Sequence, residues 1–494
     1  MEHLKEALKD STYYLGASVL AMICGLISLP IWTRTLSLEQ YGVFSLVVIT
    51  INFLSSGSKF GLQHAALRYY SHFIERGDED GLTSYYTTIM GSGIIIGVVL
   101  CSFFVLIFDK LGGNFSNMNL PFIAFMIATL GIINSLNSIQ MTILRAVQNA
   151  KLISILSVIK RYSNFLLPFL FVFLWGFSLL FTGWLITDLI ILIYLFIILG
   201  KTFKFRLRWF SFNFLKEALG YSIPLIGFEL SITMLAIGDR YMIKWLMGDA
   251  SVGIYSAGYN IASYGSEIIS SPMRMACVPI FLSIWERSGK EETREFLERL
   301  FKYYFLIAIP ILFGMIYLRD DITLVLVSKK FIAASQIIPY VVSPLIIYGA
   351  FFIYGAGFFI KRRSLSLAGL TFLSALINIG LNFFLIPSYG LKGAAIATFV
   401  AYLILSYLIF IFSRKLIKVR IPTAAIAKYI FISFIMIYIL SFISINGLVA
   451  LAGKIVLGVI TYCIGVLIVD ADLRNISSSA YYWLRRRWFV TESR

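Results

Sequence analysis

Several basic residues lie within or at the ends of long apolar segments of this chain, where a charge is costly to bury. Fixed Arg and Lys side chains in a hydrated cavity can offset the hydration that a negatively charged group loses when it leaves water. The chemistry that they offer is therefore the binding of an anion. The candidates for this cationic cavity are Arg34, Lys59, Arg240, Lys244 and Arg274.

Polar residues also form a stripe that occurs twice, 211 positions apart. In the second copy they recur at steps of three and four, which places them on one helix face. This copy consists of Ser256, Asn260, Ser263, Glu267, Ser270 and Arg274. The first copy consists of Ser45, Asn52, Ser56 and Gln63, with Lys59 where Ser270 would fall. Polar groups in membrane segments usually face a bundle interior or a water-filled cavity. We therefore expect an equivalent helix in each half, both lining a central cavity.

Acidic residues in apolar segments are candidates for coupling to a cation. They are Asp188, Glu229, Asp239 and Glu267. Asp188 stands alone in the middle of its segment, and such an acid needs a partner or a proton. Glu229 and Arg240 share one helix face but lie about 16 Å apart along the axis, which is too far for a direct ion pair. Each is expected to pair across helices or to face the cavity.

Plainer roles remain open for all these charges. Arg34, Lys244 and Arg274 lie near the ends of their segments, where long basic side chains snorkel to the membrane surface. For the deeper candidates, a structural ion pair is the alternative to a function. Lys160 and Arg161 lie about one-third into another segment and are expected to face a cytoplasmic vestibule.

The elements that position these residues are membrane-spanning helices. Of the 494 residues, 59% are hydrophobic and the mean hydropathy is +0.86, which is more than a soluble core needs. Apolar runs of about 20 residues, enough to cross a bilayer, recur throughout. We predict an all-α integral membrane protein with about fourteen spans. They cover residues 12–36, 42–70, 85–108, 120–147, 153–175, 178–200, 220–246, 253–283, 303–318, 336–360, 366–386, 393–413, 423–444 and 450–469.

The distribution of Lys and Arg predicts the orientation, because cytoplasmic loops hold an excess of both. Most of the 42 basic residues fall on one side when the N-terminus is placed in the cytoplasm, so both termini are expected there. The net charge of +17 is explained by these loops, which attract anionic membrane lipids, and not by nucleic acid.

Catalytic and metal-binding motifs are missing from the sequence. There is no phosphate-binding glycine loop, no Gly-x-Ser-x-Gly elbow and no His-Glu-x-x-His. The four cysteines and three histidines have no metal-ligand or disulfide spacing. We predict no cofactor, no metal and no enzymatic activity.

Both copies of the stripe enter the membrane in the same direction, because six spans, an even number, precede the second copy. This pattern predicts a parallel repeat whose two lobes meet at a substrate site. The expected units are a six-helix lobe over 1–210 with its linker, a second over 211–422, a two-helix hairpin over 423–470 and a basic cytoplasmic tail over 471–494.

Two segments resemble a known family. The run from Thr35 to Ser45, which includes Tyr-Gly-Val-Phe-Ser, follows the first span, and the stretch from Leu144 to Lys151 follows the fourth. With the topology, they resemble polysaccharide exporters of the oligosaccharidyl-lipid flippase type. These belong to the multidrug/oligosaccharidyl-lipid/polysaccharide (MOP) exporter superfamily. Many members have twelve spans, whereas fourteen are expected here, as in the lipid II flippases of the same superfamily.

The resemblance implies alternating access by two lobes. The implied cargo is an undecaprenyl-diphosphate-linked glycan, such as an O-antigen unit of lipopolysaccharide or a capsule unit, moved from the inner to the outer leaflet. It also implies a bacterial or archaeal cytoplasmic membrane, an ion gradient or membrane potential as the driving force, and polysaccharide polymerase or assembly proteins as partners. In lipid II flippases an extra helix pair borders a groove for the lipid tail. Residues 423–469 have this role or form a hairpin that only packs.

Two other functions remain open. A cation-coupled exporter of small amphiphilic drugs would have a more acidic cavity than the one predicted here. A membrane glycan polymerase or ligase would need catalytic groups in an external loop, where Asp320 and Asp321 are the candidates.

Overall fold

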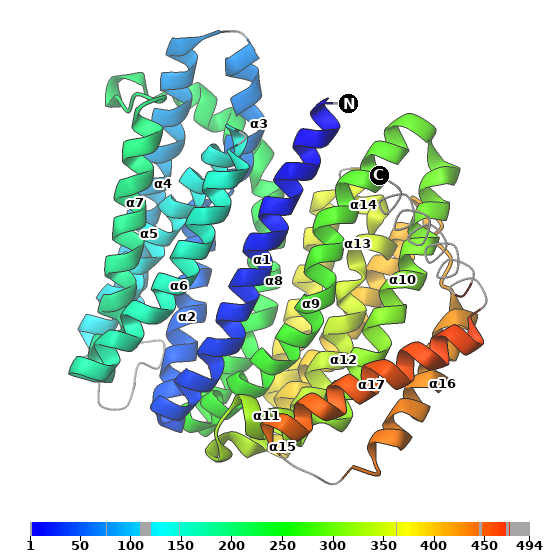
Figure 1. Cartoon of the computed structure of the whole chain (residues 1–494). Coiled ribbons are helices and arrows are strands. Elements are labelled where there is room, and N and C mark those ends of the chain that lie inside the picture. Colours follow the sequence, from blue (N-terminus) through cyan, green and yellow to red (C-terminus); the bar gives the residue numbers. More distant parts are fainter. Residues whose placement is uncertain are drawn as a thin grey trace, which may run out of the picture.

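The computed structural model describes residues 2–75, 77–108, 120–147, 149–361, 363–443, 447–470 and 474. Within these ranges every regular element is a helix, which confirms the all-α class (Figure 1). The predicted basic tail over 471–494 lies outside the described residues, with the exception of Arg474.

The first half of the chain forms seven α-helices in the order expected from the apolar runs. They are α1 (Glu2–Thr35), α2 (Leu38–Lys59), α3 (Leu62–Glu75), α4 (Glu79–Phe108), α5 (Leu120–Ala146), α6 (Ala150–Trp175) and α7 (Leu180–Gly200). Gly176, with a φ of 86°, turns the chain between α6 and α7, and Gly183 of α7 packs closely on the backbone of Pro168 in α6.

The second half contains longer and more interrupted helices. They are α8 (Phe212–Met247), α9 (Asp249–Ser288), α10 (Lys290–Tyr317), α11 (Arg319–Leu326), η4 (Lys329–Gln336), α12 (Ile338–Gly349), α13 (Phe351–Tyr354), α14 (Ala356–Ile360), α15 (Ser364–Arg414), α16 (Thr423–Leu440) and α17 (Leu448–Val469). Figure 1 shows α4 to α7 on one side of the molecule and α10, α12 to α14, α16 and α17 on the other, with α1 and α8 between them.

Among the described residues, 11 helices are long and apolar enough to cross a membrane, or up to 13 when two bent pairs are each counted as one span. One difference from the expected fourteen lies in α15, which covers two expected spans. Gly390 has non-helical dihedral angles, and Gly393 lies against the carbonyl of Leu385, so the chain folds back on itself there. The count of fourteen stays a prediction.

The second expected span, over 42–70, is not one continuous helix. It breaks where α2 ends, at Phe60 and Gly61, which have φ angles of 42° and 73°. A side chain on Gly61 would begin 2.7 Å from Cβ of Ser222 and 2.8 Å from Ile226, both in α8. The break therefore arises from close packing on α8, which is itself bent by 48° after Ile223.

Helices α2 and α9, which hold the two stripes, pack against each other through equivalent positions. A side chain on Gly42 would begin 2.0 Å from the carbonyl oxygen of Asp249, and one on Gly253 would begin 2.2 Å from that of Leu38. Adding 211 to 38 and 42 gives 249 and 253, so the two contacts are reciprocal. Such reciprocity is the mark of a two-fold axis between like surfaces. It supports the proposed repeat and the division at about residue 211, both of which stay predictions.

Candidate functional site

A polar cavity of about 550 Å³ lies between helices of both halves. Helices α1, α2, α5, α6 and α7 line it from the first half, and α8 and α9 from the second. Its aromatic lining residues are Trp32, Tyr41, Phe44, Phe165, Trp184 and Tyr264. Its charged lining residues are Lys160, Arg161, Asp188 and Arg240. With three cations and one acid, the lining suits an anionic ligand.

Asp188 of α7 has the partner that its isolated position in the sequence required. Lys160 Nζ of α6 lies 2.9 Å from Asp188 Oδ1. Asn134 of α5 donates to Asp188 Oδ2 at 3.0 Å, and Asn164 of α6 donates to Oδ1 at 3.4 Å. Lys160 also donates to Asn134 Oδ1 at 2.8 Å. Four cavity-lining side chains from three helices thus form one hydrogen-bonded cluster.

Arg161, the residue after Lys160, is exposed and lines the cavity. A side chain on Gly25 of α1 would begin 3.3 Å from Nη2 of Arg161 and 3.4 Å from the ring of Tyr264. Gly25 therefore leaves room for an arginine of α6 beside a tyrosine of α9. Among the described residues, no carboxylate lies at salt-bridge distance from Arg161. Its guanidinium forms a hydrogen bond with Tyr264, and the other donors of the guanidinium are available to a ligand.

Arg240 of α8 is the cavity's cation from the second half, and it is held by neutral groups. It donates to Ser256 Oγ at 3.2 Å and to the carbonyl of Ala236 at 2.5 Å, and its guanidinium lies 4.3 Å from the ring centre of Tyr259. The nearest carboxylate oxygen, on Asp239, is 4.0 Å away.

Asp239 itself is fully buried behind Arg240 and does not line the cavity. It accepts hydrogen bonds from Tyr255 at 2.5 Å and Thr398 at 3.2 Å. Ser256, which bonds Arg240, also accepts a hydrogen bond of 2.7 Å from Ser45, its equivalent in the first half. The cation of the second half is therefore tied to the contact between α2 and α9.

The lower part of the first stripe meets a second charged cluster, away from this cavity. Lys59 Nζ lies 2.7 Å from Glu229 Oε1, and Ser56 donates to the same oxygen at 2.9 Å. Gln63 donates to Glu229 Oε2 at 2.8 Å, and His64 Nε2 lies 3.9 Å from it. One carboxylate of α8 thus holds four side chains of α2 and α3. Lys59 thus forms an ion pair across helices, which was the alternative to a function in ligand binding.

Five of the predicted residues line the cavity, namely Ser45, Asn52, Asp188, Arg240 and Asn260. The others do not: Arg34, Ser56, Lys59, Gln63, Glu229, Asp239, Lys244, Ser263, Glu267 and Arg274. A role for these in binding or coupling stays a prediction.

Several of them have other neighbours that explain their positions. Arg34, in the last turn of α1, donates to the carbonyl of Val325 in α11 at 3.0 Å. Lys244 lies 2.5 Å from Asp249 Oδ1. Arg274 is exposed and lies further along α9 than the cavity, and its snorkelling stays a prediction.

Sequence reasoning left Asn134 and Asn164 unnoticed, although both line the cavity. Asn164 stands four residues after Lys160, on the same face of α6, and this spacing was a signal that could have found it. Lys160 and Arg161, which were expected in a vestibule, lie in the cavity wall. Within the described part of the chain, no three His, Cys, Asp or Glu side chains come together as metal ligands.

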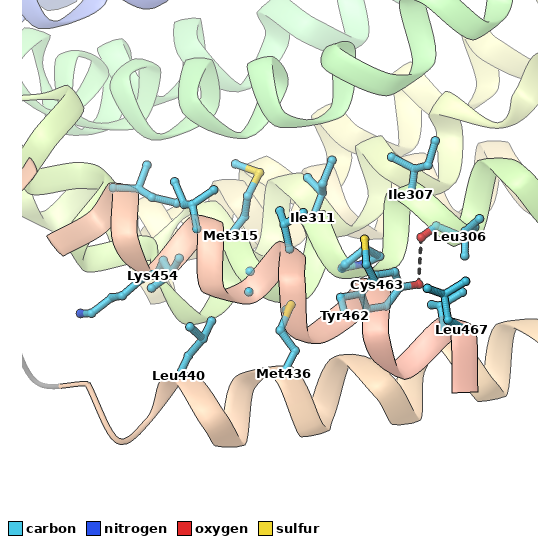
Figure 2. Close-up of a pocket in the computed structure, with 18 residues that line it drawn as sticks. Leu306, Ile307, Ile311, Met315, Met436, Leu440, Lys454, Tyr462, Cys463 and Leu467 are labelled. Atoms are coloured by element: carbon cyan, nitrogen blue, oxygen red, sulfur yellow. Dashed lines mark hydrogen bonds between the residues drawn. The ribbon is translucent and has the colours of Figure 1, made fainter. Parts of the chain in front are cut away.

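A second, apolar cavity of about 720 Å³ lies between α10, α16 and α17 (Figure 2). Figure 2 shows Met315 of α10 and Met436 of α16 on its walls, and Tyr462 of α17 donating to the carbonyl of Leu306. Lys454 also lines this groove, and it lies 2.6 Å from Asp321 of α11. Asp321, a candidate catalytic acid by sequence, is therefore held in an ion pair.

Comparison with known proteins places the sequence among membrane proteins of glycan assembly. A family model described as "Polysaccharide biosynthesis protein" matches residues 7–285. An uncharacterised membrane protein of Methanocaldococcus jannaschii is 23% identical over 449 residues, which cover 85% of this chain and 86% of that protein. The probable low-salt glycan biosynthesis flippase Agl15 of Haloferax volcanii is 22% identical over 452 residues, which cover 88% and 90%.

Solved structures share the fold. The lipid II flippase MurJ in an inward closed conformation matches with a TM-score of 0.77 at 17% identity, over 94% of this chain and 99% of that one. An inward-facing multidrug resistance MATE transporter of the MOP superfamily matches with a TM-score of 0.67 at 16% identity, over 81% and 94%. At such identities the likeness shows the fold alone, which this chain shares with both transporters.

Proposed function

Because this multi-pass membrane protein belongs to the polysaccharide biosynthesis protein family, we propose that it is a flippase for a lipid-linked glycan. The substrate that we propose is an undecaprenyl-diphosphate-linked oligosaccharide, such as an O-antigen, capsule or related unit. It moves from the inner to the outer leaflet of a bacterial or archaeal cytoplasmic membrane, with both termini of the chain in the cytoplasm. The names of MurJ and Agl15 support this class of cargo.

The observation that carries the proposal is the cationic lining of the central cavity. A diphosphate must leave water to cross the membrane, and it needs fixed positive charge in place of its hydration. Arg161 offers the guanidinium donors that do not bond Tyr264, and Arg240 offers a guanidinium from the other half of the molecule. The aromatic side chains of Trp32 and Trp184 provide apolar faces on which sugar rings can pack.

We assign the lipid tail to the apolar groove between α10, α16 and α17. Apart from Lys454 and Tyr462, its wall is made of aliphatic, methionine and cysteine side chains, which suits a prenyl chain. Tyr462 and the Lys454–Asp321 pair hold α17 against α10 and α11, so the groove is a built feature of the fold. This division places the head group in the polar cavity and the tail in a separate apolar one.

We propose that lobe movement by alternating access is coupled to an ion gradient or the membrane potential through Asp239. This acid is buried and accepts hydrogen bonds from hydroxyl groups of α9 and α15, so its protonation or cation binding would change contacts between three helices. Asp188 is less suited to coupling because an ammonium group already lies 2.9 Å from it.

Flipping of a fluorescent undecaprenyl-diphosphate oligosaccharide in proteoliposomes tests the proposal. Arg161→Ala and Arg240→Ala are each expected to slow translocation by at least about tenfold, the scale of losing charge-assisted hydrogen bonds. Arg145→Gln is the control, since Arg145 is exposed on α5 and does not line the cavity. Absence of translocation by the native chain under proton and sodium gradients would overturn the proposal. A more acidic lining would have favoured a drug exporter, and the single acid here is paired.

A further inference from the structure

We propose that Asp188 is a positioning residue that holds Lys160 ready in the cavity and releases it to the phosphate group of the substrate. The Lys160–Asp188 pair is then an ion pair that the bound anion exchanges. This inference rests on the proposed function and deepens it, because it assigns Lys160 and its neighbour Arg161 to one anion-binding face.

The pair is oriented for such an exchange. The side chain of Lys160 is 24% exposed, whereas that of Asp188 is 2% exposed. Both residues line the cavity, and the lysine side chain is the more accessible of the two. An ammonium group has three donors. Asp188 and Asn134 accept two of them, which leaves one for a ligand in the cavity.

The carboxylate keeps other donors when the ammonium group moves. Asn134 donates to Oδ2 and Asn164 to Oδ1, so each carboxylate oxygen has an amide partner besides Lys160. Asn137 donates to the backbone carbonyl of Asp188 at 3.0 Å and fixes α7 against α5 at this point. A buried carboxylate without hydrogen bonds would be too costly, and this amide cluster lowers that cost.

The exchange also has an electrostatic consequence. While Lys160 is paired, the carboxylate cancels much of its charge, so Asp188 competes with an incoming anion. An anion must therefore supply more attraction than Asp188 does, and Arg161 beside Lys160 allows bidentate contact with phosphate oxygens. Binding is weakened by the acid, and release is helped because the acid takes the ammonium group back.

Asp188→Asn is the informative variant. If Asp188 competes with the anion, its loss should raise the affinity for diphosphate; if it only supports the structure, its loss should lower that affinity. Asparagine keeps the shape and the hydrogen-bonding capacity but removes the charge. We expect Asp188→Asn to bind inorganic diphosphate roughly tenfold more tightly in titration calorimetry and to flip the lipid more slowly. Lys160→Gln is expected to bind it more weakly, and the double variant should show no tightening.

The matched control is Asp470→Asn. The Lys302–Asp470 pair has a 3.1 Å contact and exposures of 22% and 6%, close to those of Lys160–Asp188, but it lies outside the polar cavity. The loss of the Asp470 carboxylate is expected to leave the affinity for diphosphate unchanged. If Asp188→Asn does not fold, Lys160→Gln still tests whether the ammonium group contributes to binding.

The outcomes separate this inference from the proposed function. Unchanged or weaker diphosphate binding by Asp188→Asn, with lipid flipping by the native chain intact, overturns the exchange and leaves the flippase standing. Diphosphate affinity that does not depend on Lys160 does the same. A native chain that neither binds diphosphate nor flips the lipid removes the proposed function and the exchange together.

Discussion

The contact between α2 and α9 makes a strong prediction for Gly253→Ala. A methyl group at this position would lie 2.2 Å from the carbonyl oxygen of Leu38 and 3.2 Å from the amide nitrogen of Gly42. Ordinary carbon contacts begin near 3.5 Å, so the helices must separate by roughly 1 Å. Since both partners are backbone atoms, no side-chain rotation relieves the overlap.

The magnitude follows from two opposing effects. Ala is preferred to Gly inside a helix by about 1 kcal/mol, which alone would stabilise the protein. Overpacking costs about 1–3 kcal/mol, and here it applies only to the conformation in which α2 and α9 touch. Subtracting the first effect from the second leaves a net cost of up to about 2 kcal/mol, which changes a population ratio by up to roughly 30-fold. Gly253→Ala should therefore shift the protein away from this closed contact and slow flipping.

Spin labels on Glu39 and Ala250, which are equivalent positions near this contact, would report the shift as a longer distance distribution. Gly369→Ala in α15 is the control, because no heavy atom lies within 4 Å of the added methyl group. It is expected to leave distances and flipping unchanged and to raise the Tm slightly. The reasoning is refuted if Gly253→Ala gives the same distances and rate as the native chain.

Two other predictions concern the acids of α8. Glu229→Gln leaves Lys59, which is only 12% exposed, without a carboxylate partner. The loss of folding free energy should be about 1–3 kcal/mol and should appear as a lower Tm in detergent. Combining Lys59→Glu with Glu229→Lys should recover part of this stability. An unchanged Tm would mean that the pair does not hold α2 to α8. Asp239→Asn should uncouple flipping from proton or sodium gradients while diphosphate still binds, and a persistent gradient dependence in proteoliposomes would contradict this role.

Apolar runs were enough to predict the helices, because a membrane segment must satisfy its backbone hydrogen bonds internally. The bends within these segments could not be predicted in the same way. The break at Gly61 depends on Ser222 and Ile226 lying against it, and the reversal at Gly390 on packing of Gly393 against Leu385. Glycine in a run permits such a bend, but only the neighbouring helix decides whether it occurs.

The repeat spacing predicted that one helix of each half lines a central cavity, but not what each polar residue contacts. Ser45 and Ser256 hydrogen-bond each other, as equivalent residues near a two-fold axis can. Lower on the same face, Lys59 turns to Glu229 of α8 and not to the cavity. Helix periodicity assigns residues to a face, whereas the neighbour that covers each part of the face follows from tertiary packing.

The polarity of the cavity depends on which member of each ion pair faces it. Lys160 is the more exposed member of its pair, although Asp188 also lines the cavity, and Arg240, 4% exposed, lines the cavity whereas the fully buried Asp239 does not. Both pairs are close to neutral in total charge, yet both present their cation to the cavity. The same residues with the acids in front would line it for a cation. Counting charges along the sequence therefore cannot predict whether the ligand is an anion or a cation. The ligand interacts with the charge at the cavity surface, whereas the buried acid sets only how firmly that charge is held.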